Sequence, residues 1–212
     1  MQHASLKMYF TEECAKLMQK KESKLYSLID IHRNTITKED SWIPELKLTT
    51  IHKSDIESNA EICDAVINAA TSLLQKHVPH MTLQHTTFHQ HLQYCPFESV
   101  HIHHNGAGHF VTSSSIGNKV TLYDSLNLVP NSEINHQLVA LCSVDEAIPT
   151  TYLVKIPSLQ HGSTNCGIFA IAYATELTYG TNPATVIFDQ AQMRPHLINC
   201  LQNRNLIPFP KK

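Results

Sequence analysis

The sequence of 212 residues lacks several features that would assign it to a class at once. Charged residues make up only 16% of it and the net charge is −2, so no basic field indicates nucleic acid or an anionic membrane as a partner. Its apolar runs are far too short to cross a bilayer. Residues 1–10 do not show the charged-then-apolar order of a secretory signal. We therefore expect neither nucleic acid nor a membrane among its partners.

The cysteines also lack the arrangement of a disulfide or zinc framework. There are six, they are scattered along the chain, and no two form a CxxC pair. In a chain of this length without a secretory signal, reduced thiols are expected, which fits a cytosol-like compartment. The six positions are Cys14, Cys63, Cys95, Cys142, Cys166 and Cys200.

The length and the 42% share of hydrophobic residues fit one full-sized globular domain with a little chain to spare. Between Thr11 and His32, apolar residues recur at helical spacing, which predicts an amphipathic helix. The pattern breaks from Asn34 to Pro44, where turn-forming residues gather. We therefore predict an N-terminal helical extension over residues 1–40 and a main domain over residues 41–212.

Within the main domain, the hydrophobic periodicity predicts helices that enclose a run of short strands. Helices are expected over Asn59–Gln75, Glu133–Leu141, Cys166–Thr178 and Pro183–Leu201. Strands are expected over Val100–His103, Gly108–Ser113, Val120–Tyr123 and Tyr152–Ile156, followed at the end of the chain by an extended tail, Leu206–Pro210. This order is typical of a mixed α+β domain.

One cysteine occupies a position that favours a reactive thiolate. A polar loop that starts at Gln160 runs directly into the apolar helix that begins at Cys166. Asn165 is expected to cap this helix by accepting from the open amides of its first turn. Those amides and the helix dipole lower the pKa of a thiol at this place, and Gly167 leaves the sulfur uncrowded. Taken alone, however, a cysteine before an apolar helix is more often a core residue.

A histidine and an aspartate upstream supply the groups that a nucleophilic cysteine requires. His109 follows a glycine-rich turn at the start of one strand, and Asp124 ends the next strand. A short hairpin between these strands would bring the two side chains together. The carboxylate could then hold one ring nitrogen and leave the other to deprotonate a thiol. Gln160 could donate its amide toward an oxyanion beside the backbone N–H of Cys166.

The order of these residues resembles that of the ubiquitin-like-protein-specific proteases, the adenain and sentrin-protease-like group of clan CE cysteine peptidases. The matching runs are His109-Phe110-Val111, Tyr123-Asp124-Ser125, Gln160 and Asn165-Cys166-Gly167-Ile168-Phe169. The resemblance extends over residues 48–201. It implies a short central mixed sheet flanked by helices, with the catalytic cysteine at the N-terminus of a buried helix. It also implies that His109 is the general base and Asp124 its orienting residue. Gln160 would be an oxyanion donor and Cys166 the nucleophile.

The same resemblance implies an activity and a partner. The expected reaction is cleavage after the C-terminal Gly-Gly of ubiquitin or a related modifier of the SUMO or NEDD8 type, including its conjugates, by a monomer that needs no cofactor. Phe110, Asn165 and Gly167 are expected to contact the modifier. In the family, tryptophans commonly roof the Gly-Gly channel, whereas here Phe110 follows the histidine and the first-helix position holds Glu61 or Ile62. The expected location is the cytoplasm or nucleus, including that of a host cell for a bacterial protein delivered there.

Two other functions fit the same residues. An acetyltransferase of the same clan uses a similar His-acid-Cys set to move acetyl groups from acetyl-CoA onto proteins. A catalytically inactive chain would only bind a modifier, although such a chain has no need of all four residues.

The fifteen histidines suggest a further hypothesis, a metal site. His85 and His89 would share a helix face, and His101 and His103 would share a strand face, with His91 and His104 close in the sequence. Zinc sites usually combine a compact recurrent spacing with cysteine or acidic ligands. We therefore expect no metal and interpret the stretch around His101 as a half-exposed strand. Arg194 is expected on the surface of the last helix, with contact to a substrate tail as the alternative.

Overall fold

The computed structural model describes residues 40–86, 92–95, 97–143, 150–157 and 159–212. The predicted helix Thr11–His32 lies outside these residues, so the extension over residues 1–40 stays a prediction. No helix within the described ranges is both long and apolar enough to cross a membrane.

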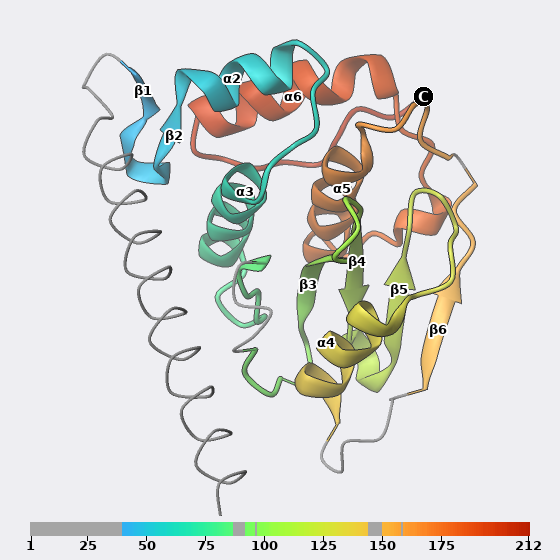
Figure 1. Cartoon of the computed structure of the whole chain (residues 1–212). Coiled ribbons are helices and arrows are strands. Elements are labelled where there is room, and N and C mark those ends of the chain that lie inside the picture. The colour runs from blue at the N-terminus through green and yellow to red at the C-terminus, as the bar shows by residue number, and fades with distance from the viewer. Residues whose placement is uncertain (1–39, 87–91, 96, 144–149, 158) are drawn as a thin grey trace, which may run out of the picture. The chain divides into compact units, whose positions relative to one another are not determined.

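A four-stranded mixed sheet lies at the centre of the main domain (Figure 1). Its strands, in spatial order, are β3 (Val100–His104), β4 (Phe110–Ser114), β5 (Val120–Tyr123) and β6 (Thr151–Val154). The first three are antiparallel neighbours, whereas β6 runs parallel to β5. A parallel pair needs a crossover connection, and α4 (Ser132–Cys142) lies in that connection.

Helices cover both faces of the sheet. Successive side chains of β4 point to opposite sides, so neighbouring residues of this strand contact different helices. Phe110 belongs to the main core, and Thr112 donates a hydrogen bond of 2.9 Å to the carbonyl of Ala170 in α5 (Cys166–Thr178). Val111, between them, packs in a smaller cluster with Ile134 and Leu138 of α4. The sheet therefore has α5 on one face and α4 on the other (Figure 1).

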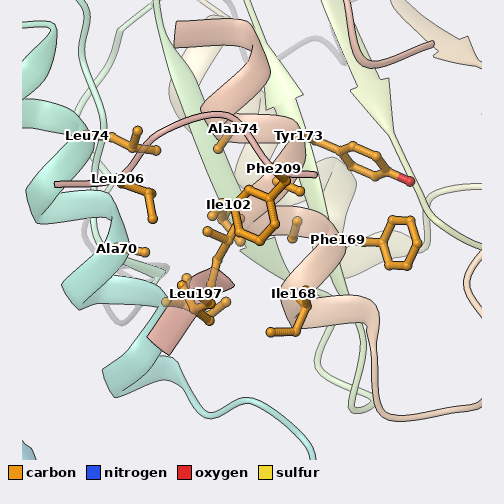
Figure 2. Packing of buried hydrophobic residues seen from close by; sticks show 14 of the residues in the cluster. Ala70, Leu74, Ile102, Ile168, Phe169, Tyr173, Ala174, Leu197, Leu206 and Phe209 are labelled. Carbon is orange, nitrogen blue, oxygen red and sulfur yellow. The ribbon is translucent and has the colours of Figure 1, made fainter. Parts of the chain in front are cut away.

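The main core lies between the sheet, α5 and α3 (Asp64–His77), as Figure 2 shows. Every residue of α5 is buried, which agrees with a sequence that is apolar on all sides of the helix. The C-terminal tail closes this core, since Leu206 and Phe209 are only 2% exposed and lie against it.

Two further helices cover the end of the domain at which α5 begins. α2 (Thr50–Glu57) and α6 (Gln190–Gln202) lie side by side there (Figure 1). The short strands β1 (Ser41–Ile43) and β2 (Leu48–Thr49) precede α2. Single 3-10 turns occupy Pro44–Leu46, Ile116–Asn118 and Pro183–Thr185.

The predicted α+β class and the mixed sheet flanked by helices are confirmed, and β5 and α5 have the predicted bounds. Two helix starts are wrong. α3 begins at Asp64 rather than at Asn59, because Asn59 has a positive φ of 59° that no helix continues. α6 begins at Gln190 rather than at Pro183, because Phe188 forms a β-bridge with Lys211 of the tail.

The prediction that β3 is half-exposed is also wrong. His101 and His103 are 3% and 1% exposed. The reason is a long-range one, since α4 contacts β3 and its Gln137 accepts a hydrogen bond from Nδ1 of His103 at 2.9 Å. Strand alternation in the sequence could not show that this second face of the sheet is covered.

Candidate active site

The β4–β5 hairpin brings His109 and Asp124 together, as the sequence predicts. Thr112 lies opposite Tyr123 in the register, so the residue before β4 and the residue after β5 lie at the same end of the sheet. Nε2 of His109 is 2.7 Å from Oδ1 of Asp124, and both residues are buried. The carboxylate is itself fixed, because it accepts from the backbone N–H groups of Leu126 and Leu128 at 2.8 and 3.1 Å.

Packing of α5 against β4 brings Cys166 to this pair. Its Sγ lies 3.9 Å from the carbonyl oxygen of Gly108, the residue before His109. Because Asp124 engages Nε2 of the imidazole, Nδ1 is the ring nitrogen left for the thiol. The chain thus arranges a thiol, an imidazole and a carboxylate in series.

Each charged group of this series stabilises the charged form of its neighbour. Burial alone would lower the pKa of His109, but hydrogen bonds to Asp124 and Cys166 and the attraction of their charges raise it to about 9. Burial alone would raise the pKa of the Cys166 thiol, but His109 and the backbone N–H groups of Phe110 and Gly167 lower it below its usual value. The arrangement therefore raises the share of Cys166 that is thiolate, beside a His109 that holds its proton at neutral pH.

Asn165 does not cap α5 in the predicted way. It is the residue before the helix, but its side chain makes no capping hydrogen bond. Its Oδ1 instead accepts from Nε and Nη2 of Arg194, at 3.2 and 3.0 Å, and its Nδ2 donates to the carbonyl of His161 at 2.9 Å. The first-turn amides of α5 are therefore not occupied by this side chain.

Gln160 is buried beside the series, and both ends of its amide are held. Its Oε1 accepts from the hydroxyl of Ser125 at 2.5 Å, and its Nε2 donates to the carbonyl of Gly162 at 2.9 Å. Since an amide nitrogen carries two hydrogens, one N–H remains for another acceptor. These two hydrogen bonds fix the side chain of Gln160 and connect the loop before α5 to the residues that follow β5.

A pocket of about 430 Å³ opens onto Cys166. Its lining comes from the segment that leads into α3, from Thr86, from the β3–β4 hairpin and from the first residue of α5. The lining residues are Glu61, Ile62, Cys63, Asp64, Thr86, His104, Gly108, Phe110 and Cys166. Phe110 stands edge-on to the ring of His104, with centroids 4.9 Å apart.

Gly167 serves a purpose that differs from the predicted one. A Cβ built at this position would lie 2.9 Å from the Cβ of Ile62, closer than real contacts allow. The glycine therefore lets the segment before α3 close onto the first turn of α5. Glu61 and Ile62, the two residues that the sequence suggested for this wall, both line the pocket.

The histidine-rich stretch contains no group of three or more metal-ligating side chains among the residues that the structure places. His89 and His91 lie outside those residues. His85 is 2.9 Å from the hydroxyl of Ser72, and His103 is held by Gln137 and Ser113.

Arg194 is buried, although the sequence predicts it on the surface of the last helix. It is 6% exposed and does not lie on the helix surface. The sequence contains one signal for this position. Arg194 is next to Met193 and three residues before Leu197, and both of these apolar residues of α6 are buried. An arginine on the buried side of a helix needs polar partners, and those of Arg194 include carbonyls of residues more than a hundred positions earlier in the chain.

No protein-family model matches the sequence, and no curated protein matches it. Solved structures do. The chain superposes on a structure of the SUMO protease Ulp1 with its catalytic cysteine oxidised to a sulfonic acid, with a TM-score of 0.60 and 13% identity over 84% of this chain and 93% of that one. The C-terminal Ulp1 protease domain in complex with SMT3, the yeast ortholog of SUMO, matches with a TM-score of 0.55 and 13% identity over 74% and 83%.

The catalytic domain of an Ulp1-like SUMO protease from Chaetomium thermophilum matches with a TM-score of 0.52 and 17% identity, over 70% of this chain and 74% of that one. The chain therefore has the fold of the ubiquitin-like-protein-specific proteases of clan CE, as its sequence motifs predict.

Proposed function

We propose that this chain is a cysteine protease that cleaves after the C-terminal Gly-Gly of ubiquitin or a ubiquitin-like modifier, both in precursors and in conjugates. The observation that carries the proposal is the buried series of Asp124, His109 and Cys166 at the mouth of a pocket. The fold supports it, because the superposed structures are of SUMO proteases. We place the activity in the cytoplasm or nucleus, where thiols stay reduced.

In the proposed reaction, the thiolate of Cys166 attacks the carbonyl carbon of the terminal glycine. The carbonyl oxygen becomes an oxyanion, for which the backbone N–H of Cys166 and the remaining N–H of Gln160 are the proposed donors. As the intermediate collapses, the bond to the lysine nitrogen breaks and His109 gives its proton to the leaving amine. Water, deprotonated by His109, then attacks the thioester carbonyl. The C–S bond breaks, the modifier leaves as a carboxylic acid that ionises, and the thiolate of Cys166 is restored beside the protonated His109.

The walls of the pocket support a preference for a tail without side chains. Ile62 packs against Gly167 on one side of Cys166, and Phe110, the first residue of β4, directly follows the general base. Both are 8% exposed or less, so neither can turn away freely. We propose that the modifier's Gly-Gly lies between these walls, where a larger residue would clash.

The test is titration with modifier probes that carry a C-terminal electrophile, using SUMO, NEDD8 and ubiquitin in parallel. We expect one of them to form a thioether with Cys166 and the corresponding conjugate to be cleaved. Cys166→Ala should abolish turnover and still bind the modifier. Normal cleavage by this variant would refute the assignment.

The same probes separate the two alternatives. Acetylation of Cys166 by acetyl-CoA without reaction toward any probe would indicate an acetyltransferase. Binding of a modifier without labelling of the cysteine would indicate a binding module.

A further inference from the structure

Arg194 is a buried cation whose hydrogen bonds in the described chain all go to uncharged oxygen atoms. Its guanidinium donates to the carbonyls of Asp55 and Ile56 at 3.2 Å, of Ala60 at 2.8 Å and of Thr164 at 3.0 Å. Its other contacts are to Oδ1 of Asn165. A guanidinium that is held only by carbonyl and amide oxygens keeps its positive charge without a carboxylate to cancel it.

These contacts join three segments of chain that meet at the start of α5. The carbonyls of Asp55 and Ile56 belong to the C-terminal end of α2, where the helix dipole is negative and favours a cation. Ala60 lies in the connection that continues to Ile62, one wall of the pocket. Thr164 and Asn165 are the two residues directly before Cys166. One side chain therefore fixes the pocket wall and the nucleophile relative to each other.

We infer that Arg194 is a positioning residue of the active site, which holds the segment that ends in Cys166 and supplies a buried positive charge that favours its thiolate. The inference rests on the proposed role of Cys166 as nucleophile. It explains why Asn165 does not cap α5, since its Oδ1 is committed to Arg194. The charge of Cys166 in turn favours the charged form of Arg194, against burial, which lowers its pKa. Because an interaction between two charges is mutual, we expect Arg194 to favour the thiolate as well, by less than His109 and the backbone N–H groups of Phe110 and Gly167 do.

Other charged groups surround Cys166 and stay unchanged in the proposed variants. His109 and, beyond it, Asp124 approach from the β4–β5 side. Glu61, Asp64 and His104 line the pocket. A change in the titration of Cys166 on substitution of Arg194 therefore reports on Arg194 itself.

The first experiment measures the rate at which iodoacetamide alkylates Cys166 as a function of pH, with the modified peptide followed by mass spectrometry. In Arg194→Met we expect the apparent pKa of Cys166 to rise by about one unit. In Arg194→Lys, which keeps the charge but lacks the planar fork, we expect a smaller rise. This readout needs no substrate, so it tests the inference even if no modifier is cleaved.

The second experiment measures kcat and KM with the modifier that the probes identify. Arg194→Lys should lower kcat several-fold with little change in KM, because the amide of Cys166 is no longer held in place. The matched control is Arg204→Met, which removes an exposed arginine that pairs with the exposed Glu45 at 2.9 Å, and it should leave both readouts unchanged.

Variants of Arg194 that unfold at a lower temperature, yet keep the wild-type alkylation profile and the wild-type kcat, would overturn the inference and leave a purely structural arginine. If Arg194→Met does not fold, Arg194→Lys decides the question alone, since an unchanged kcat in that variant contradicts the inference.

Discussion

Two buried histidines belong to the β3–β4 hairpin, one on a strand and one in the turn, and their surroundings shift their pKa values in opposite directions. His103 on β3 is 1% exposed, and burial lowers its pKa to about 4. His109, the residue directly before β4, is 8% exposed, and its pKa is raised to about 9. Burial acts in the same direction on both. The difference comes from the partners, which are neutral for His103 and charged for His109.

The hydrogen bonds show how each state is fixed. Gln137 uses its Nε2 to donate to Glu133 and to the carbonyl of His104, so its Oε1 accepts from Nδ1–H of His103. Nε2 of His103 then accepts from the hydroxyl of Ser113 at 2.7 Å. Both nitrogens of this neutral imidazole have hydrogen-bond partners, and neither partner carries a charge that would stabilise a second proton. His109 faces a carboxylate on one side and a thiol on the other, so it gains from a proton.

The largest expected effect comes from making the partner of His109 neutral. Asp124→Asn keeps the shape of the side chain and removes the charge that stabilises the imidazolium. We expect the pKa of His109 to fall, the thiolate population to drop, and kcat to decrease by on the order of 10⁴-fold, the size of loss that follows when the orienting carboxylate of a serine-protease triad becomes an amide. The measurements are the hydrolysis rate of a modifier substrate and the NMR titration of His109.

The pH profile of the wild type sharpens this test. Activity should rise with pH through the lowered pKa of Cys166 and fall as pH rises through about 9, where His109 loses the proton that the leaving amine needs. In Asp124→Asn the alkaline limb should move to lower pH. Glu45→Gln, the same chemical change at an exposed position, is the control and should match the wild type. An unchanged alkaline limb in Asp124→Asn would show that Asp124 does not set the pKa of His109.

Much of this site could be predicted from the sequence because it is built from local patterns. The glycine-rich turn before His109 and the strand that ends at Asp124 imply a hairpin, and a hairpin fixes which ends meet. Cys166 at the junction of a polar loop and an apolar helix could be placed in the first turn for the same reason. In each case a short stretch of chain determines the geometry.

The features that the sequence did not show depend on contacts between distant segments. Whether β3 is covered depends on α4, more than thirty residues later, and the buried state of His103 follows from Gln137. Asn165 was expected to cap its own helix, a local preference, but Arg194 of α6 competes for the same oxygen and satisfies it. Local propensity therefore predicts the elements well, whereas the buried polar network decides what their side chains do.

The next effect concerns stability in acid. Burial depresses the pKa of His101 to about 3 and that of His103 to about 4. In the unfolded chain both titrate near 6.5, so below this pH the unfolded state binds protons that the folded state does not. Their contribution to stability is fully present above pH 6.5 and is lost as pH falls toward 4. His109 adds little to this slope, because its raised pKa leaves it protonated in the folded state and an ordinary imidazole is also protonated in the unfolded chain below pH 6.5.

We expect the free energy of unfolding to fall by on the order of 1 kcal/mol per pH unit for each of the two histidines between about pH 6 and pH 5. Urea unfolding at pH 7.5, 6.5, 5.5 and 5.0 measures this slope. Nε2 of His101 is buried and has no hydrogen-bond partner among the described residues, so His101→Leu is the variant of choice and should roughly halve the slope. His136→Gln, at an exposed position of α4, should not alter it. An equal slope in His101→Leu and the wild type would contradict the assignment.

The smallest expected effect comes from the converse of Asp124→Asn, a change that gives His103 a charged partner. Gln137→Glu places a carboxylate at the atom that lies 2.9 Å from Nδ1 of His103. Because Glu133 lies one helical turn before it and accepts from Gln137, the change is made together with Glu133→Gln, so that two carboxylates do not repel each other. The NMR titration of His103 should then show a pKa more than one unit above 4, which corresponds to about 1.4 kcal/mol of added attraction. Glu133→Gln alone is the control. If His103 still titrates near 4 in the double variant, burial rather than the charge of the partner accounts for the difference between the two pKa values. That result would also contradict the assignment of the raised pKa of His109 to its charged partners.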